Sequence, residues 1–324
     1  MSERVTLGEI TCPSGELVLM DGGYLRLWSG SRPPEDGRPG DIPPGVDFEI
    51  DGPDADAAAR SFDRQHGRTL YDIPEHAAET FAAGFDAHCR EHGHDAHLRR
   101  LERQVPHRER VRRAIAGGEP GFIVSGVPVV PLGGVPADRP LRVTAEPDEE
   151  GCWLSIRIDA GGGPVARRLE MAHLGVDNAR FVFADAGALD EWRHDEPIDG
   201  LADLVFWGRE AAQLAAELRV PSIGDGEFGW RDLPAFVAYQ RALNLEERRE
   251  RMQRPMFNFD FRPHSHHFQV MALVRPAEHQ AGVIRVGGAD VMFAMTTVGD
   301  GYFPVHAEWD AAGRLVGVEI TIAY

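Results

Sequence analysis

The last forty residues, 285–324, constrain the fold more than any other part of the sequence. They contain a short apolar run at 291–297, Val-Met-Phe-Ala-Met-Thr-Thr, with glycines on both sides. Such a run is typical of a strand that is buried on both faces. Gly299-Asp300-Gly301 follows, and these residues tolerate the positive φ angles of a tight turn. We therefore predict that a buried strand ends here and that the chain reverses.

Residues 302–322 alternate between apolar and polar side chains, which is the period of half-buried strands. Asp310-Ala311-Ala312-Gly313 interrupts the alternation and has the Asp and Gly positions of a type I turn. The apolar positions are Phe303, Val305, Ala307 and Trp309 before the turn, and Val316, Val318, Ile320 and Ile322 after it. Together with 291–297, these stretches predict three antiparallel strands that lie as a meander inside a sheet.

The charge and composition exclude several classes of protein. A formal net charge of -18 opposes general binding to nucleic acid or to an anionic membrane, because both are polyanions. A hydrophobic content of 43% in 324 residues is enough to build a core. All 34 basic residues are arginine, so no lysine is present to form a Schiff base or to bind phosphate in a loop.

Three cysteines, Cys12, Cys89 and Cys152, share no spacing of a metal site and are odd in number. The polar start of the sequence has no apolar core of a signal peptide. These two features predict a reduced cytoplasmic protein. The longest apolar passage, 121–136, is interrupted by three prolines, so we expect no membrane span.

The domain organisation follows from shifts in composition. We predict one domain over 1–324 that carries a helical insertion at 54–118, where Ala, Arg, Glu and His dominate. Two further helices are predicted at 203–219 and 232–252, and residues 29–44, rich in Gly and Pro, are interpreted as a surface loop. The predicted fold class is α+β, a mostly antiparallel sheet in the form of a curled half-barrel or a sandwich with packed helices. Gly-Asp-Gly-Glu-Phe at 224–228 echoes the later turn, but we do not interpret it as a repeat.

Four segments resemble a known bacterial family. They are Pro-Ser-Gly with the strand after it at 13–23, residues 41–50, Gly-Val-Asp-Asn-Ala at 175–179 with the strand after it, and the C-terminal Gly-Asp-Gly-Tyr-Phe-Pro-Val hairpin. The order is similar to that of the family called domain of unknown function 4241. The resemblance implies a β-rich fold and no established chemistry. The histidine-bearing segment at 54–118 departs from the family pattern.

Histidines near the C-terminus give the first candidate metal site. His264 and His266 are two residues apart, as are His306 and Glu308, so on adjacent strands they would project four ligands toward one ion. We expect one divalent transition metal as the cofactor. The alternative is that His306 and Glu308 simply form the polar side of a half-buried strand.

A second group of histidines lies in the segment 88–97, which contains four histidines and Cys89. His88 and His92 share one helix face and could bind zinc or, in neutral form, act as general acid or base. The alternative is a solvated turn rich in histidine. Of these residues, His88 is the candidate catalytic group.

Aspartates beside glycine turns form the third group. Asp21, Asp177 and Asp300 are the candidate catalytic carboxylates, because turns at one end of a sheet can gather acid–base chemistry. The alternative is that each carboxylate accepts hydrogen bonds from backbone amides of its own turn.

Two functions stay open on this basis. The first is an enzyme that acts on a small-molecule ligand in a metal-assisted pocket on the sheet. The second is a non-catalytic, immunity-type interaction protein whose acidic surface binds a basic protein partner. The enzyme predicts that the histidines converge in one pocket, whereas the interaction protein predicts that they scatter.

Overall fold

The computed structural model describes residues 4–62, 64–224, 226–252 and 256–322. These residues form 19 strands in four antiparallel sheets and six α-helices, which confirms the predicted α+β class. The chain divides into two compact units, where the sequence had suggested one domain. Unit 1 comprises Met1–Trp192 and Leu273–Tyr324, and unit 2 comprises Arg193–Ala272.

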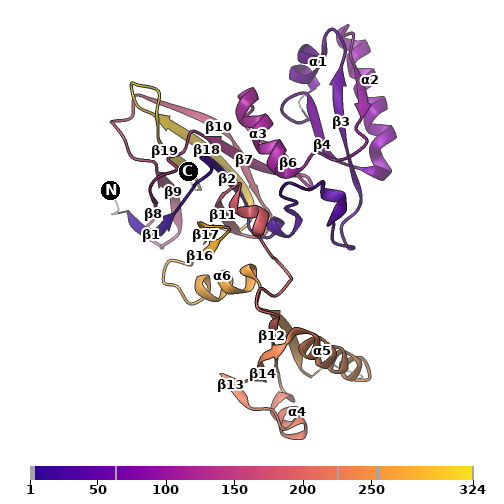
Figure 1. The fold of residues 1–324 in the computed structure, drawn as a ribbon, viewed down its shortest axis with the longest axis vertical. Helices are drawn as coiled ribbons and strands as arrows, with labels where there is room; N and C mark the ends of the chain where they lie inside the picture. The colour runs from indigo at the N-terminus through magenta and orange to yellow at the C-terminus, as the bar shows by residue number, and fades with distance from the viewer. Residues whose placement is uncertain (1–3, 63, 225, 253–255, 323–324) are drawn as a thin grey trace. The chain divides into compact units, whose positions relative to one another are not determined.

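Two six-stranded sheets form the body of unit 1 (Figure 1). Sheet A has the order β1 (Val5–Ile10), β8 (Leu141–Pro147), β9 (Trp153–Asp159), β19 (Leu315–Thr321), β18 (Gly301–Trp309), β10 (Arg167–Val176). Sheet B has the order β16 (Ala281–Val286), β17 (Ala289–Met295), β11 (Arg180–Asp185), β2 (Glu16–Asp21), β7 (Val127–Gly133), β6 (Phe122–Val124).

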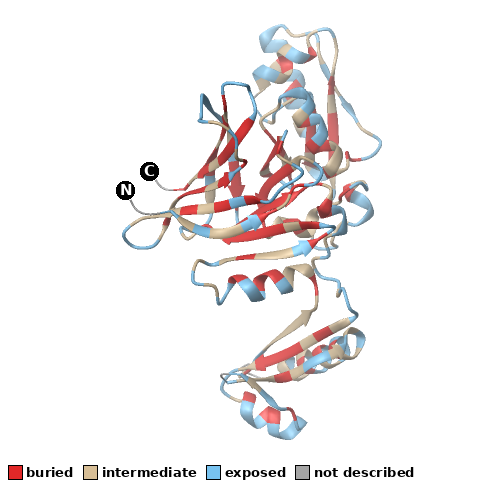
Figure 2. Cartoon of the chain, turned by 60° about the vertical axis from the view of Figure 1, so that its left-hand side comes forward, coloured by how far each residue is buried: buried red, intermediate tan, exposed pale blue. Residues whose placement is uncertain are grey.

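One apolar core lies between these sheets. It contains Ile156, Val305 and Ile320 of sheet A together with Leu19 and Phe183 of sheet B, all fully buried or nearly so. Buried residues follow the strands of both sheets in Figure 2. Unit 1 is therefore a sandwich of two antiparallel sheets, the second of the two predicted forms.

The C-terminal strands confirm the predicted alternation but not the predicted meander. The hairpin β18–β19 forms as expected, and Asp310 accepts hydrogen bonds from the backbone N–H groups of Ala312 and Arg314 at 2.9 and 3.0 Å. The preceding strand β17 belongs to sheet B, however, whereas β18 belongs to sheet A. The glycine turn carries the chain from one sheet to the other, and this places the apolar faces of both strands in the same core.

A smaller layer in unit 1 occupies the segment predicted as a helical insertion. Sheet C has the order β4 (Thr69–Pro74), β3 (Gly45–Asp51), β5 (His97–Arg100), and helices α1 (Ala55–Phe62) and α2 (Ala78–His92) pack against it. The 3-10 helices η1 (Tyr24–Leu27), η2 (Pro34–Asp36) and η3 (Glu75–Ala77) and the helix α3 (His107–Gly117) complete this part. The segment is therefore not purely helical, because β4 and β5 supply partners for β3.

Unit 2 has an architecture related to that of sheet C and its two helices. Sheet D has the order β13 (Ser222–Gly224), β14 (Glu227–Pro234), β12 (Leu201–Trp207), β15 (Asn258–Pro263), with helices α4 (Ala211–Leu218) and α5 (Ala235–Glu250). The 3-10 helix η4 (Ala188–Glu191) precedes it in unit 1, and α6 (His266–Val274) follows it. Both predicted helices begin too early, since Asp203 lies in β12 and Asp232 in β14. A short apolar run such as 204–207 does not distinguish a buried strand from a helix. None of the described helices combines the length and apolarity that a membrane crossing needs.

The order of elements occurs twice along the chain. The first half runs from β1 to β9 and the second from β10 to β19. Each half begins with two strands and 3-10 helical structure, followed by a strand–helix–strand–helix–strand segment. A helix and four strands complete each half. The second half adds only the short β13. The pairings correspond: β1-β8-β9 matches β10-β18-β19, β2-β7-β6 matches β11-β17-β16, and β4-β3-β5 matches β14-β12-β15. The chain is thus an internal duplication, which the sequence interpretation missed.

The halves join where equivalent strands pair, at β9 with β19 and at β2 with β11. The strand orders of sheets A and B therefore read the same from either edge. The longest sequence pattern that the two halves share is Val-x-x-Asp-x-Gly-x-Leu-x-x-Trp, at 18–28 and again at 182–192. The Gly-Asp-Gly echo at 224–228 and 299–303 is not part of it, because both copies lie in the second half of the chain.

Two buried aspartates of this shared pattern connect the halves reciprocally. Asp21, which is fully buried, accepts hydrogen bonds from the backbone N–H groups of Asp177 and Asn178 at 2.6 and 2.9 Å, in the turn before β11. Asp185 accepts hydrogen bonds from the backbone N–H and hydroxyl of Ser14 at 2.7 and 2.6 Å, in the turn before β2. Each half therefore supplies the carboxylate that binds the turn of the other half.

We predict that Asp21→Ala and Asp185→Ala each lower the free energy of unfolding by about 3 kcal/mol, because each removes a buried carboxylate that accepts several hydrogen bonds. Asp300→Ala is the matched control. Its exposed carboxylate accepts one backbone N–H, that of Ala179 at 2.8 Å, so a loss of about 1 kcal/mol is expected. Urea unfolding followed by circular dichroism measures all three. Equal losses at Asp21 and Asp300 would contradict the structural role.

Candidate small-molecule pocket

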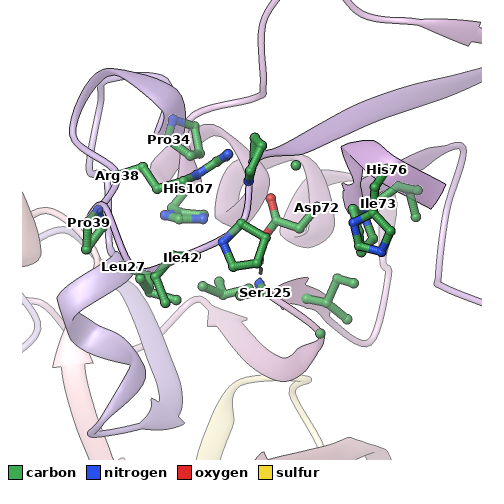
Figure 3. A pocket seen from close by; sticks show the side chains of 17 residues that line it. Leu27, Pro34, Arg38, Pro39, Ile42, Asp72, Ile73, His76, His107 and Ser125 are labelled. Atoms are coloured by element: carbon green, nitrogen blue, oxygen red, sulfur yellow. Dashed lines mark hydrogen bonds between the residues drawn. The ribbon is translucent and has the colours of Figure 1, made fainter. Parts of the chain in front are cut away.

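A cavity of about 280 Å³ lies in unit 1 beside the end of β4, the first residue of α3 and the β6–β7 turn (Figure 3). Its wall is mostly apolar. The apolar side chains come from Leu27, Ile42, Ile73, Ile123 and Val124, and from prolines at 34, 39, 43, 44 and 74. Pockets of this kind, with few polar groups, are the usual form of a small-molecule site.

The loop interpreted from the sequence as surface structure forms one side of this pocket. Pro34, Pro39, Pro43 and Pro44 all line the cavity. Each proline ring fixes its own φ angle and offers an apolar face, so the loop can act as a preformed wall. The four prolines of this loop, together with Ile42, were the feature of the sequence that could have indicated the pocket.

His107 is the most buried polar side chain that lines the cavity, with 1% of its surface exposed. Its Nδ1 accepts a hydrogen bond from the backbone N–H of Ser29 at 2.9 Å, and its ring stacks on Trp28 with 5.3 Å between centroids. Because Nδ1 is an acceptor, the proton of the neutral ring lies on Nε2. Nε2 has no hydrogen-bond partner among the described residues.

The charge state of His107 follows from its surroundings. Burial, and then the nearby Arg110, lower the pKa of His107 to about 3. The ring is therefore neutral at physiological pH and offers an N–H donor. A group with so low a pKa is a poor general base.

A buried cluster of charges supports the pocket from behind. Arg110, fully buried, donates to Asp72 at 2.8 Å and to Asp47 at 3.3 Å, and it stacks over the ring of Tyr71. Asp72, which lines the cavity, also accepts hydrogen bonds from Gln104 at 2.8 Å and from the backbone N–H of Ser125 at 2.7 Å. Its carboxylate is thus held in place by three donors.

The two aspartates of this cluster respond differently to burial. Burial raises the pKa of Asp47, and the attraction of Arg110 offsets this only in part. Burial acts in the same direction on Asp72, but Arg110 outweighs it and the pKa of Asp72 lies below its ordinary value. Asp72 is therefore an anion at neutral pH that is committed to Arg110, and not a free base.

The four predicted metal ligands are divided between the two units of the chain. His264 and His266 lie in unit 2, whereas His306 and Glu308 lie in unit 1. The expected neighbouring strands do not occur, because β15 pairs with β12 and β18 pairs with β10 and β19. His266 is also the first residue of α6 and not part of a strand, so the two-residue spacing places nothing on a common face.

His306 and Glu308 match the alternative interpretation. Both lie on β18, where Glu308 forms ion pairs with Arg157 and Arg168. His306 lies 3.8 Å from Glu170. A carboxylate already neutralised by two arginines has its charge satisfied by the protein, so these residues act as the polar side of a strand.

His264 has a different environment. Its Nδ1 lies 2.9 Å from Asp199, and its Nε2 lies 3.2 Å from Asp203 and 3.9 Å from Asp232. Burial lowers the pKa of His264, but the hydrogen bonds to Asp199 and Asp203 outweigh it and raise the pKa above its ordinary value.

His88 lies on α2 among other histidines, outside the pocket. Its ring stacks on His92 with 4.1 Å between centroids, and its Nε2 lies 2.7 Å from the hydroxyl of Ser61. His94 lies 3.1 Å from the same hydroxyl. Partial burial, and then the neighbouring His92 and His94, lower the pKa of His88. The structure thus gathers these histidines at one place but brings no carboxylate of the predicted catalytic set to them.

The three predicted catalytic carboxylates lie near one turn, residues 177–179. Asp21 binds the turn that contains Asp177, and Asp300 binds the backbone N–H of Ala179 in the same turn. Asp177 accepts a hydrogen bond from the Tyr24 hydroxyl at 3.0 Å. Backbone amides thus occupy Asp21 and Asp300, although the amides belong mainly to other turns and not to their own.

The chain matches no family model, no curated protein and no solved structure. The resemblance to a family of unknown function stays a prediction from its motifs.

We predict that Arg110→Met lowers the free energy of unfolding by about 3–5 kcal/mol at neutral pH, because Asp47 and Asp72 remain buried without their cation. In the variant, burial and mutual repulsion raise both pKa values above the unfolded value of about 4. A carboxyl group whose pKa is raised by folding stabilises the fold at a pH below its unfolded pKa, and this stabilisation is lost as the pH rises through the folded pKa. The deficit should therefore be smallest near pH 4 and largest at pH 7.

Urea unfolding at several pH values between 4 and 7 measures this deficit. Arg112→Met is the control, since Arg112 lies on the same helix but is 51% exposed and lies 3.6 Å from Glu16. We expect it to change the stability by less than about 1 kcal/mol at every pH. A deficit in Arg110→Met that does not depend on pH would contradict the assigned charge cluster.

Proposed function

We propose that this protein binds a small, largely apolar molecule in the pocket beside His107, through a hydrogen bond from His107 Nε2 to an acceptor on the ligand. The observation that carries the proposal is the side chain of His107, which lines an apolar cavity and whose buried Nε2–H has no partner among the described residues. An unpaired buried donor costs about 1–3 kcal/mol, and a ligand acceptor would recover that cost.

The size and polarity of the cavity support a compact ligand. Its volume of about 280 Å³ is near the lower end of the range of about 300–1,000 Å³ that is usual for ligand pockets. Arg38, His76 and Asp72 are the other charged or titratable side chains of the wall. Arg38 donates a hydrogen bond to Gln104, and Asp72 is bound by Arg110. The neutral His107 is therefore the group that selects the ligand.

Recognition of a ligand is the part of the small-molecule hypothesis that this geometry supports. Asp72 is occupied and His107 is a poor base, so turnover would need groups of the ligand itself or of a second reactant. The enzymatic and metal-assisted form stays a prediction, as does the alternative of an acidic interaction protein with a basic partner.

The proposal is tested with benzamide, which has a carbonyl acceptor, and with toluene, which has a similar ring and no acceptor. Saturation-transfer NMR and calorimetric titration of the full chain should show that wild-type protein binds benzamide more tightly. His107→Asn places an acceptor near Nδ1 and removes the Nε2 donor, so we expect about 5–10-fold weaker binding of benzamide and little change for toluene. Wild-type affinity should not vary between pH 5 and 8, because His107 stays neutral there.

Ile42→Trp provides a second variant, in which a larger side chain fills the cavity from a partly exposed position of the loop. We expect it to abolish binding of both probes while the protein stays folded by circular dichroism. Binding of benzamide that survives in both variants would refute the proposed site.

A further inference from the structure

The second half of the chain carries a polar centre at the place equivalent to the Asp47–Asp72 pair. The bulged register of β12 with β14 is the same as that of β3 with β4, so Asp203 corresponds to Asp47 and Asp232 to Asp72. In each pair the first carboxylate accepts a hydrogen bond from the backbone N–H of the second aspartate, at 2.9 Å in unit 2 and 2.8 Å in unit 1. Asp232 and Asp72 also share a left-handed backbone, with φ of 52° and 54°.

The two centres differ in the group that faces the carboxylates. Helices α3 and α6 begin with equivalent histidines, since the Nδ1 of His107 accepts from Ser29 and that of His266 accepts from Arg193. Counting from these residues, Gln269 stands where Arg110 stands in the first half. In the second half it is His264 that lies beside the carboxylates. A permanent cation is thus replaced by a residue that can bind a proton or a metal ion.

The geometry of His264 is that of a metal ligand with an outer carboxylate. A carboxylate oxygen of Asp199 lies 2.9 Å from Nδ1 of His264, so the proton of the neutral ring lies on Nδ1. The lone pair of Nε2 then faces Asp203 and Asp232. One ligand atom from each of Asp203, Asp232 and His264 lies within 4.8 Å of the other two. Asp203 and His264 are 16% exposed, whereas Asp232 is 73% exposed, so the site is open to solvent on one side.

We propose that Asp203, Asp232 and His264 of unit 2 bind one divalent transition metal ion of the zinc type, with Asp199 positioning the histidine ring. Two carboxylate oxygens and one imidazole nitrogen are ligands that Zn²⁺ and Mn²⁺ accept, and solvent would complete the coordination. The expected cofactor is therefore retained, but at a site that shares only His264 with the one predicted from sequence.

The alternative occupant of Nε2 is a proton, which would make His264 an imidazolium held between carboxylates. The two occupants exclude each other, because both need the same lone pair. The experiment therefore has to measure metal binding directly, without relying on stability alone.

The test uses the full chain after treatment with a chelator. Zinc is titrated calorimetrically at pH 7.5, and Co²⁺ absorption reports the donor set. Wild-type protein should bind one equivalent at this site. Asp232→Asn changes an exposed side chain, so this variant should still fold. Asp232→Asn and His264→Gln should each weaken zinc binding at least 10-fold. Asp199→Asn should weaken binding about 10-fold, because it removes only the positioning contact.

His88→Gln is the matched control, since His88 lies in the other histidine cluster of the chain and outside unit 2. It should leave the affinity of the proposed site unchanged. The proposal is overturned if wild-type protein takes up no zinc, or if zinc binding is lost in His88→Gln and retained in His264→Gln and Asp232→Asn.

Discussion

The sandwich of unit 1 depends on two buried carboxylates, one from each half of the chain, and each of them binds a turn of the other half. Backbone N–H groups of a turn need an acceptor, and strand pairing cannot supply it where the strands end. Asp21 and Asp185 supply it across the junction of the halves. Because each aspartate ends its own strand and binds the turn before the other, the two contacts fix β2 beside β11. The strand order of sheet B extends outward from that pair.

The duplicated scaffold then supports two different polar centres. In the first half, Arg110 is a permanent cation that forms ion pairs with Asp47 and Asp72, and the charge cluster is a structural support for an apolar pocket. In the second half, His264 lies beside Asp203 and Asp232. An imidazole exchanges its proton near neutral pH, whereas a guanidinium does not. The same backbone geometry therefore faces a guanidinium in one half and an imidazole in the other.

Local pattern predicted much of the secondary structure but not its connections. The alternation at 303–322 and the turn at Asp310 gave the β18–β19 hairpin correctly. Residues 203–207 were assigned to a helix, because a short apolar run fits both periods. Residues 232–234 were assigned to a helix because Asp232 and Pro234 have the order of an N-cap and a first helical turn. The duplication escaped notice because the two halves share backbone topology while keeping few identical side chains.

By itself the sequence determined where the C-terminal hairpin turns and that no lysine contributes chemistry, since these depend on residue type and on neighbours along the chain. Only the tertiary structure decided what each polar residue does. Asp21 and Asp72 are both aspartates near strand ends, yet one joins the halves and the other supports a pocket. The difference lies in donors that come from residues more than thirty positions away, and no spacing along the chain reveals such partners.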